Sequence, residues 1–171
     1  MSQMQLLHIN LNPADRVYTN DWVVADMVDF FKPSGRILDP CKGDGVFLKY
    51  LPGADWCEIE KGKDFFAWSN PVDWVFGNPP YSIFREWMKH SMKISENICY
   101  LIPCNKPFNS YYLLDEVLEW GGIAHMRIYG TAKVFNMKLG FAAGAVHFKK
   151  GYSGPMYFSK AAFPSNTACS G

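Results

Sequence analysis

The chain has 171 residues, a length that suits one domain with a sizeable core. Hydrophobic residues make up 49% and charged residues 19%, which excludes an intrinsically disordered chain. The formal net charge is only +1, which argues against a protein that grips a long stretch of nucleic acid by its phosphates. No apolar run reaches membrane-spanning length, and the N-terminal residues lack the charged region and long apolar stretch of a signal peptide, so we expect a cytoplasmic protein with no membrane partner.

The cysteines and histidines do not suggest a metal site. The five cysteines are odd in number and include no CxxC pair, which predicts free and mostly buried thiols in a reducing compartment. The four histidines have neither metal-ligand nor catalytic-triad spacing, so we expect no metal. The cysteines are Cys41, Cys57, Cys99, Cys104 and Cys169.

Strand-like and helix-like runs alternate along the chain. After an irregular arm at 1–17, apolar residues at helical spacing predict a helix at 22–31, with N-cap candidates just before it. Residues 141–149 and 156–159 resemble a terminal antiparallel hairpin, and the small, polar residues 160–171 are typical of a disordered tail. The other predicted strands are 36–40, 54–59, 72–76, 97–102 and 123–129, and the other predicted helices are 46–51, 82–92 and 111–120.

This alternation predicts an α/β fold with a mostly parallel sheet, a C-terminal antiparallel hairpin and helices on both faces. We see no interdomain linker, so residues 1–171 are expected to form a single domain. In such sheets, ligands bind beyond the carboxyl ends of the strands.

A glycine-rich loop, Asp39-Pro40-Cys41-Lys42-Gly43-Asp44-Gly45, leaves the first clear strand and enters a helix. It is neither a P-loop nor a complete GxGxxG, and such a turn by itself is often only a turn. The next predicted strand ends at Glu60, where nucleotide-binding sheets place an acid for the ribose hydroxyls; the alternative is a solvated residue in the charged stretch 58–64. Asp64 and Phe65 then offer a hydrogen-bonding group and a ring that suit the edge and the face of adenine.

The run Asn78-Pro79-Pro80-Tyr81 follows another predicted strand. Two prolines there favour a sharp and rigid turn. The Asn78 side-chain oxygen and the Pro79 carbonyl are two acceptors that could hold both hydrogens of an exocyclic amine. Fixed dipoles of this kind stabilise positive charge that develops on the nitrogen during its alkylation, and Tyr81 could stack on a planar substrate. In isolation, the run is equally compatible with a plain turn.

These segments, in this order, resemble a class I methyltransferase of the N6-adenine DNA type. The run Ile37-Leu38-Asp39-Pro40-Cys41-Lys42-Gly43-Asp44-Gly45-Val46-Phe47-Leu48 is similar to the first motif of that family, and NPPY to its catalytic motif. Tyr18-Thr19 resembles the upstream segment that lies beside the methionine moiety, and residues 135–138 and 140–141 loosely resemble a late motif that clamps a flipped base. The resemblance covers residues 17–150.

The resemblance implies a Rossmann-like fold, S-adenosylmethionine as cofactor, and adenine in DNA as substrate, in a bacterial or phage-encoded enzyme. The implied catalytic residues are Asn78, Pro79, Pro80 and Tyr81, and the implied cofactor-binding residues are Tyr18, Thr19, Asp39, Pro40, Gly43, Gly45, Glu60, Asp64, Phe65 and Asn78. The substrate-binding candidates are Tyr81, Arg85, Lys106, Asn109, Lys138 and Phe141, within a substrate surface that includes the loop 105–112. That loop is equally interpretable as a solvated surface.

Two alternatives stay open. The same four residues occur in enzymes that methylate adenine in RNA or the side-chain amide of glutamine in proteins, and a third hypothesis is a non-catalytic cofactor-binding subunit. The chain is expected to lack a separate target-recognition domain. A target sequence in DNA would then be read by loops of this domain, by a second copy of the chain or by a separate specificity partner.

Overall fold

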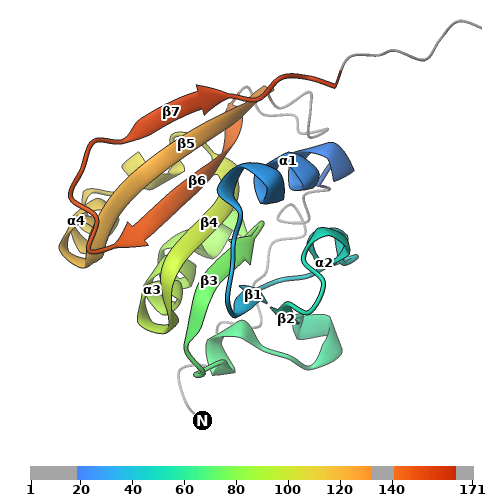
Figure 1. Ribbon diagram of the computed structural model, residues 1–171. Coiled ribbons are helices and arrows are strands. Elements are labelled where there is room, and N and C mark those ends of the chain that lie inside the picture. Colours follow the sequence, from blue (N-terminus) through green and yellow to red (C-terminus); the bar gives the residue numbers. More distant parts are fainter. Residues whose placement is uncertain (1–18, 132–140, 165–171) are drawn as a thin grey trace, which may run out of the picture.

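A computed structural model of the chain describes residues 19–131 and 141–164 (Figure 1). In this part of the chain seven strands form one sheet, in the order β2-β1-β3-β4-β6-β5-β7. Only β6 runs against its neighbours, because it pairs antiparallel with β4 and β5 while the other pairs are parallel. The strands are β1 (Ile37–Asp39), β2 (Asp55–Trp56), β3 (Val72–Gly77), β4 (Ser95–Pro103), β5 (Gly121–Thr131), β6 (Ala142–Lys150) and β7 (Tyr157–Lys160).

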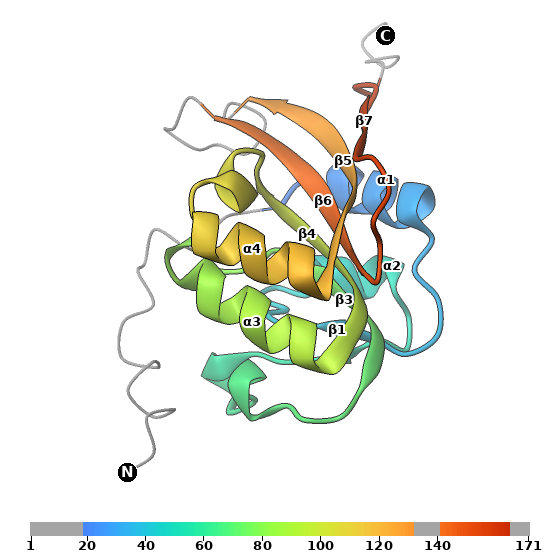
Figure 2. The same ribbon diagram turned by 90° about the vertical axis from the view of Figure 1, so that its left-hand side faces the viewer.

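Helices cover both faces of the sheet. Figure 2 shows α3 and α4 side by side on one face, and α1 and α2 on the other. Each face has its own apolar core, one that includes Met88 and Leu113 and one that includes Met27 and Phe47. The sheet and its covering helices are those of the predicted α/β fold. The helices are α1 (Asp21–Phe31), α2 (Val46–Tyr50), α3 (Phe84–Ile94) and α4 (Tyr111–Trp120), with short 3-10 turns at Ile59–Lys61, Phe65–Ala67, Tyr81–Ile83 and Lys106–Phe108.

Helix α1 is tied to the sheet by a half-buried charge network. The Arg127 guanidinium on β5 donates to both oxygens of Asp26, at 2.6 and 2.8 Å, and the Tyr129 hydroxyl donates to the same carboxylate at 2.7 Å. Burial raises the pKa of Asp26, but the bonds from Arg127 and Tyr129 outweigh it and leave the pKa below its ordinary value. A bidentate pair of this kind fixes orientation as well as distance, so it holds the middle of α1 against β5.

The C-terminal strands differ from the prediction. Residues 142–150 do belong to an antiparallel hairpin, but the partner is β5, and β7 pairs parallel with β5 at the sheet edge. The first residues of the expected disordered tail are ordered. Lys160 ends β7, the Ala161 side chain is buried, and the Ala161 backbone N–H donates to the Ile128 carbonyl at 2.9 Å. The expected arm at 1–17 and residues 165–171 lie outside the described residues. Within the described residues, none of the helices has the length and apolar character needed to cross a membrane.

The Asp26 network is expected to contribute strongly to stability. Asp26→Ala should lower the free energy of unfolding by about 3 kcal/mol, because it leaves a half-buried guanidinium and a phenol without their carboxylate. Glu96→Gln is the matched control, because its pair with Lys150 spans 3.8 Å on the surface, and it should change stability by less than about 0.5 kcal/mol. Urea unfolding followed by circular dichroism measures both; equal losses in the two variants would contradict this role.

Candidate functional site

The loops after β1 and β3 lie side by side. Ile37 pairs with Trp74 and Leu38 with Val75 in parallel register, so both strands end at the same edge of the sheet. Gly77 allows the two loops to approach, since a Cβ built on it would lie 3.0 Å from both Asp39 Oδ1 and Pro40 Cδ. The sheet therefore brings together the predicted glycine-rich loop and the NPPY turn.

The glycine-rich loop keeps an open surface. Gly43 and Gly45 have φ values of +48° and +86°, a left-handed conformation that other residues rarely adopt. A Cβ built on either residue would meet no atom within 4 Å among the described residues. These glycines are therefore required by the backbone conformation rather than by internal crowding, and they leave space over the loop for a ligand.

Asp39 lies beneath this loop with its side chain fully buried. Its Oδ1 accepts a bond from the Cys41 backbone N–H at 3.2 Å, while its buried Oδ2 has no partner among the described residues. Burial, with a smaller contribution from nearby Glu58, raises the pKa of the Asp39 carboxyl to about 7 against the opposing effect of the Cys41 bond. A buried carboxylate with one unsatisfied oxygen suits a cationic or hydrogen-bond-donating ligand group.

Beyond β2, the carboxylate that bonds to the backbone of the glycine-rich loop is that of Glu58. Strand β2 is shorter than predicted and ends at Trp56, which places Glu60 on an exposed 3-10 turn. Glu58 Oε2 accepts a bond from the Gly43 backbone N–H at 2.8 Å, so this carboxylate faces the loop. Sequence reasoning missed Glu58 because it extended the strand; the signal was that Glu58 is the first acid after the β2 residues.

Asp64 and Phe65 are placed differently by the structure. Asp64 caps the 3-10 turn Phe65–Ala67 through a 3.0 Å bond from the Phe66 N–H. The Phe65 ring is only 2% exposed and packs against Trp87, with 4.5 Å between ring centroids. In this structure the ring is part of the core under α3, so its faces are occupied by protein side chains, and its contact with adenine stays a prediction.

Asn78 is held from two sides. Its side-chain Nδ2 donates to Thr19 Oγ1 at 3.1 Å, and its backbone carbonyl accepts a bond from the Cys41 thiol at 2.8 Å. Burial raises the pKa of the Cys41 thiol well above its usual range, so the sulfur keeps the proton it donates. Asn78 Oδ1 is buried and has no partner among the described residues, so the amide oxygen remains able to accept hydrogen bonds.

The rest of the NPPY turn packs closely against β4. Pro79 and Pro80 are buried, and Tyr81 is half-buried with its hydroxyl donating to the Leu101 carbonyl at 3.3 Å. This bond fixes the Tyr81 ring at the same sheet edge as Asn78.

The predicted substrate-binding residues are spread around this edge. Arg85, in the first turn of α3, forms an ion pair with Glu116 at 3.4 Å, and it shares this carboxylate with Lys89. Lys106 and Asn109 lie in the loop after β4, where Lys106 is half-buried and Asn109 is exposed. Phe141 is 47% exposed and precedes β6, next to the end of β4. The remaining two predicted positions, Tyr18 and Lys138, lie outside the described residues.

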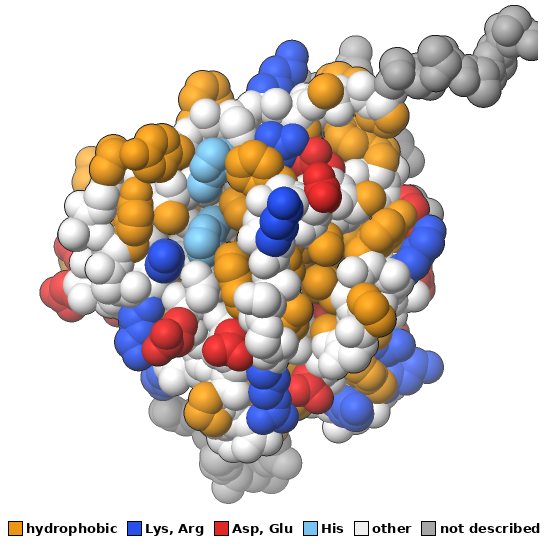
Figure 3. Space-filling model, in the orientation of Figure 1, with side chains coloured by type: hydrophobic (Ala, Val, Ile, Leu, Met, Phe, Trp, Pro, Cys, Tyr) orange, Lys and Arg blue, Asp and Glu red, His pale blue; other side chains and the backbone are white. Residues whose placement is uncertain are grey.

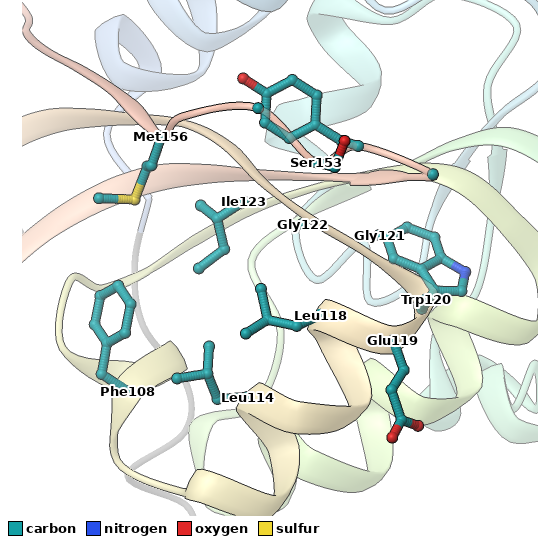
Figure 4. Close-up of a pocket in the computed structure, with 13 residues that line it drawn as sticks. Phe108, Leu114, Leu118, Glu119, Trp120, Gly121, Gly122, Ile123, Ser153 and Met156 are labelled. Atoms are coloured by element: carbon teal, nitrogen blue, oxygen red, sulfur yellow. The ribbon is translucent and has the colours of Figure 1, made fainter.

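A cavity of about 580 Å³ lies away from the glycine-rich loop and the NPPY turn. It lies between α4, β5 and the segment that leads to β7. Figure 4 shows Leu114, Leu118 and Ile123 lining it, with Phe108 and Met156 at one end. None of the predicted cofactor or catalytic residues borders it. Because its lining is mainly apolar and lacks the convergent polar groups of the loop edge, we place the candidate site at the edge formed by β1 and β3.

Known structures share this architecture. A protein from Listeria monocytogenes described as a class I S-adenosylmethionine-dependent methyltransferase is similar with a TM-score of 0.61 and 12% identity, over 92% of this chain and 71% of that one. A modification subunit of a type I restriction enzyme from Vibrio vulnificus is similar with a TM-score of 0.60 and 13% identity, over 95% of this chain. This chain thus spans about half the length of the Vibrio protein, with 50% of it covered.

A dimethyladenosine transferase from Plasmodium falciparum is similar with a TM-score of 0.58 and 13% identity, over 79% of this chain and 63% of that one. No family model matches the sequence, and no curated protein matches it. At these identities the likeness is one of architecture, and the chain has the Rossmann-like fold of class I methyltransferases.

The buried Asp39 is expected to make the ligand-free protein less stable as pH rises. Its pKa is near 3.8 when unfolded and about 7 when folded, so between these values the unfolded chain ionises while the folded one stays protonated. The free energy of unfolding should fall between pH 4 and pH 7 by up to about 4 kcal/mol, and then level off. Asp39→Asn should remove most of this fall, as measured by urea unfolding at several pH values; an unchanged pH profile would contradict the assignment.

Proposed function

We propose that this protein transfers the methyl group of S-adenosylmethionine to the exocyclic N6 amine of adenine in DNA. The observation that carries the proposal is the buried Oδ1 of Asn78, which has no partner among the described residues and lies in the turn adjoining an open glycine loop with a buried carboxylate. One half of this arrangement suits the cofactor and the other half suits a planar amine.

The residues around the loop fit the cofactor. Gly43 and Gly45 leave room over the backbone for its methionine moiety, and Asp39 Oδ2 offers a buried anionic acceptor there. Glu58 faces the loop from β2 and would accept the ribose hydroxyls, in place of Glu60. Asp64 is retained for the adenine edge. The cofactor, when bound, supplies an electrophilic methyl group on a sulfonium.

The NPPY turn would hold the acceptor amine. Asn78 Oδ1 and the Pro79 carbonyl accept the two amine hydrogens, which directs the nitrogen lone pair away from both acceptors and toward the loop. Because the Asn78 amide donates to Thr19, its oxygen rather than its nitrogen faces the amine. Both acceptors are held before substrate arrives, so positive charge that develops on the nitrogen is stabilised without reorganisation.

Adenine is the acceptor best supported. The first motif of this sequence begins with Asp39-Pro40, as in the N6-adenine DNA enzymes that it resembles. The similar structures include a modification subunit of a type I restriction enzyme and a dimethyladenosine transferase, which supports an adenine substrate in nucleic acid.

The substrate can be identified directly. Labelled S-adenosylmethionine is offered with duplex DNA, single-stranded DNA, RNA and protein extract, and the products are digested and resolved by nucleoside and amino-acid analysis. We expect N6-methyladenine in DNA, because the site is shaped for an amine on a planar ring. Label found only in RNA or only in glutamine would overturn the DNA assignment, and calorimetry with no cofactor binding at millimolar concentration would overturn the enzyme itself.

Asn78→Ala tests the catalytic half of the site. Turnover should fall by about 100-fold or more, because the main acceptor for the amine is lost. The dissociation constant of the cofactor, measured by calorimetry, should stay within about twofold, corresponding to less than 0.5 kcal/mol. Asn70→Ala, at an exposed position before β3, is the control and should leave both quantities unchanged. A large loss of cofactor affinity in Asn78→Ala would show that the two halves are wrongly assigned.

A pair of glutamates tests the cofactor half. Glu58→Gln keeps an oxygen for the Gly43 N–H but removes the charge, and it should weaken cofactor binding by about tenfold. Glu60→Gln changes an exposed residue two positions away and should have no comparable effect. Calorimetric titration of both variants with S-adenosylmethionine measures the two losses of cofactor affinity. A larger loss in Glu60→Gln than in Glu58→Gln would identify Glu60 as the ribose ligand.

A further inference from the structure

Two adjacent tyrosines at the start of α4 project from the surface. The Tyr111 and Tyr112 side chains are 83% and 75% exposed, the highest values among the large hydrophobic residues of the described chain. The core contacts of α4 are made by Leu113 and Val117, and its N-terminus is capped by the Ser110 hydroxyl, which accepts from the Leu113 N–H at 3.3 Å. Neither tyrosine ring is therefore needed for packing or for capping.

These rings lie at the same sheet edge as the NPPY turn. Helix α4 follows the loop after β4, and the Tyr81 hydroxyl is bonded to the Leu101 carbonyl near the end of that strand. The Arg85 guanidinium, in the first turn of α3 just after NPPY, lies 5.9 Å from the centre of the Tyr112 ring. The first turns of α3 and α4 thus place an aromatic ring and a cation together, and α3 begins directly after the 3-10 turn that starts at Tyr81.

The charges beside the rings are few. Arg85 and Lys89 share the single carboxylate of Glu116, at 3.4 and 3.0 Å, which leaves one positive charge in excess. Asp115 lies one turn beyond Tyr111, so phosphates are favoured on the Arg85 side. Figure 3 shows the face of the molecule that is turned to the viewer in Figure 1. On this face, Lys and Arg side chains are interspersed with Asp and Glu and do not form a basic stripe. Stacking on aromatic rings requires less charge than a grip on duplex phosphates.

We propose that Tyr111 and Tyr112 form a stacking platform for unpaired bases that flank the target adenine, so that the preferred substrate is a single strand. The proposal rests on the function proposed above and names its substrate class. Stacked bases next to the target would hold the strand against α3 and α4 while the NPPY turn binds the amine. Arg85 contributes a cation to the Tyr112 side of the platform.

Strand binding without cofactor isolates the platform from the chemistry. Fluorescence anisotropy is measured with a labelled single-stranded DNA of about 20 nucleotides, with the RNA of the same sequence and with the matching duplex. Wild type should bind both single strands more tightly than the duplex. The double variant Tyr111→Ala/Tyr112→Ala should bind single strands at least about tenfold more weakly, whereas Tyr111→Phe/Tyr112→Phe should stay within about twofold, because the ring faces are kept.

Tyr157→Ala is the matched control, since this tyrosine is 60% exposed on the edge strand β7 and should not affect strand binding. Unchanged thermal midpoints verify that the surface variants fold. Tighter binding of the duplex by wild type, or wild-type affinity in the double alanine variant, would overturn the proposal. If DNA is methylated but the tyrosines prove irrelevant, the platform alone fails. If ring-dependent strand binding occurs without any methyl transfer, the platform stands and the proposed function fails.

Discussion

The parallel pairing of β1 with β3 is the constraint on which the candidate site depends. Parallel strands end at one edge of a sheet, so their pairing alone brings the loop that follows Asp39 next to the turn that begins at Asn78. Gly77 makes the contact close, because any Cβ there would press on Asp39 and Pro40. A side chain at this one position would therefore require Asp39 or Pro40 to shift by a few tenths of an ångström.

The position of Asn78 connects distant parts of the chain. The Cys41 thiol binds its backbone from the glycine loop, and the Thr19 hydroxyl binds its amide from the segment before α1. Helix α1 is in turn fixed to β5 by the Asp26 network. The orientation of one amide oxygen therefore depends on contacts from two distant segments, which agrees with the precision that the proposed amine binding would require.

The candidate site also contains a buried group, the Asp39 carboxyl, that lowers the stability of the folded protein. Burial of the Asp39 carboxyl, one oxygen of which has no partner in the part of the chain that the structure describes, disfavours the ionised form and raises its pKa. A protein optimised only for stability would place an apolar or neutral side chain there. Retention of an acid at this position is understandable if a ligand supplies the missing partner, since the desolvation penalty would then be offset on binding.

The sequence by itself determined those features that follow from local chemistry. The turn at Gly43 and Gly45 and the rigid turn of Pro79 and Pro80 could be predicted, because glycine and proline act on their own backbone. The exact span of α4 was also predictable from its apolar spacing. Only the tertiary structure decided the features that depend on residues far apart in the chain, among them the burial of Phe65 and the parallel docking of β7 on β5.

The same distinction applies within the site. Glu58 replaces Glu60 as the acid that faces the loop because β2 ends as soon as its pairing with β1 ends, and strand pairing is not visible in a single short run. The bond from Asn78 to Thr19 joins residues 59 positions apart, and no local pattern contains it. The sequence therefore determined which chemical groups are present at the sheet edge, whereas long-range packing decided which of them face one another.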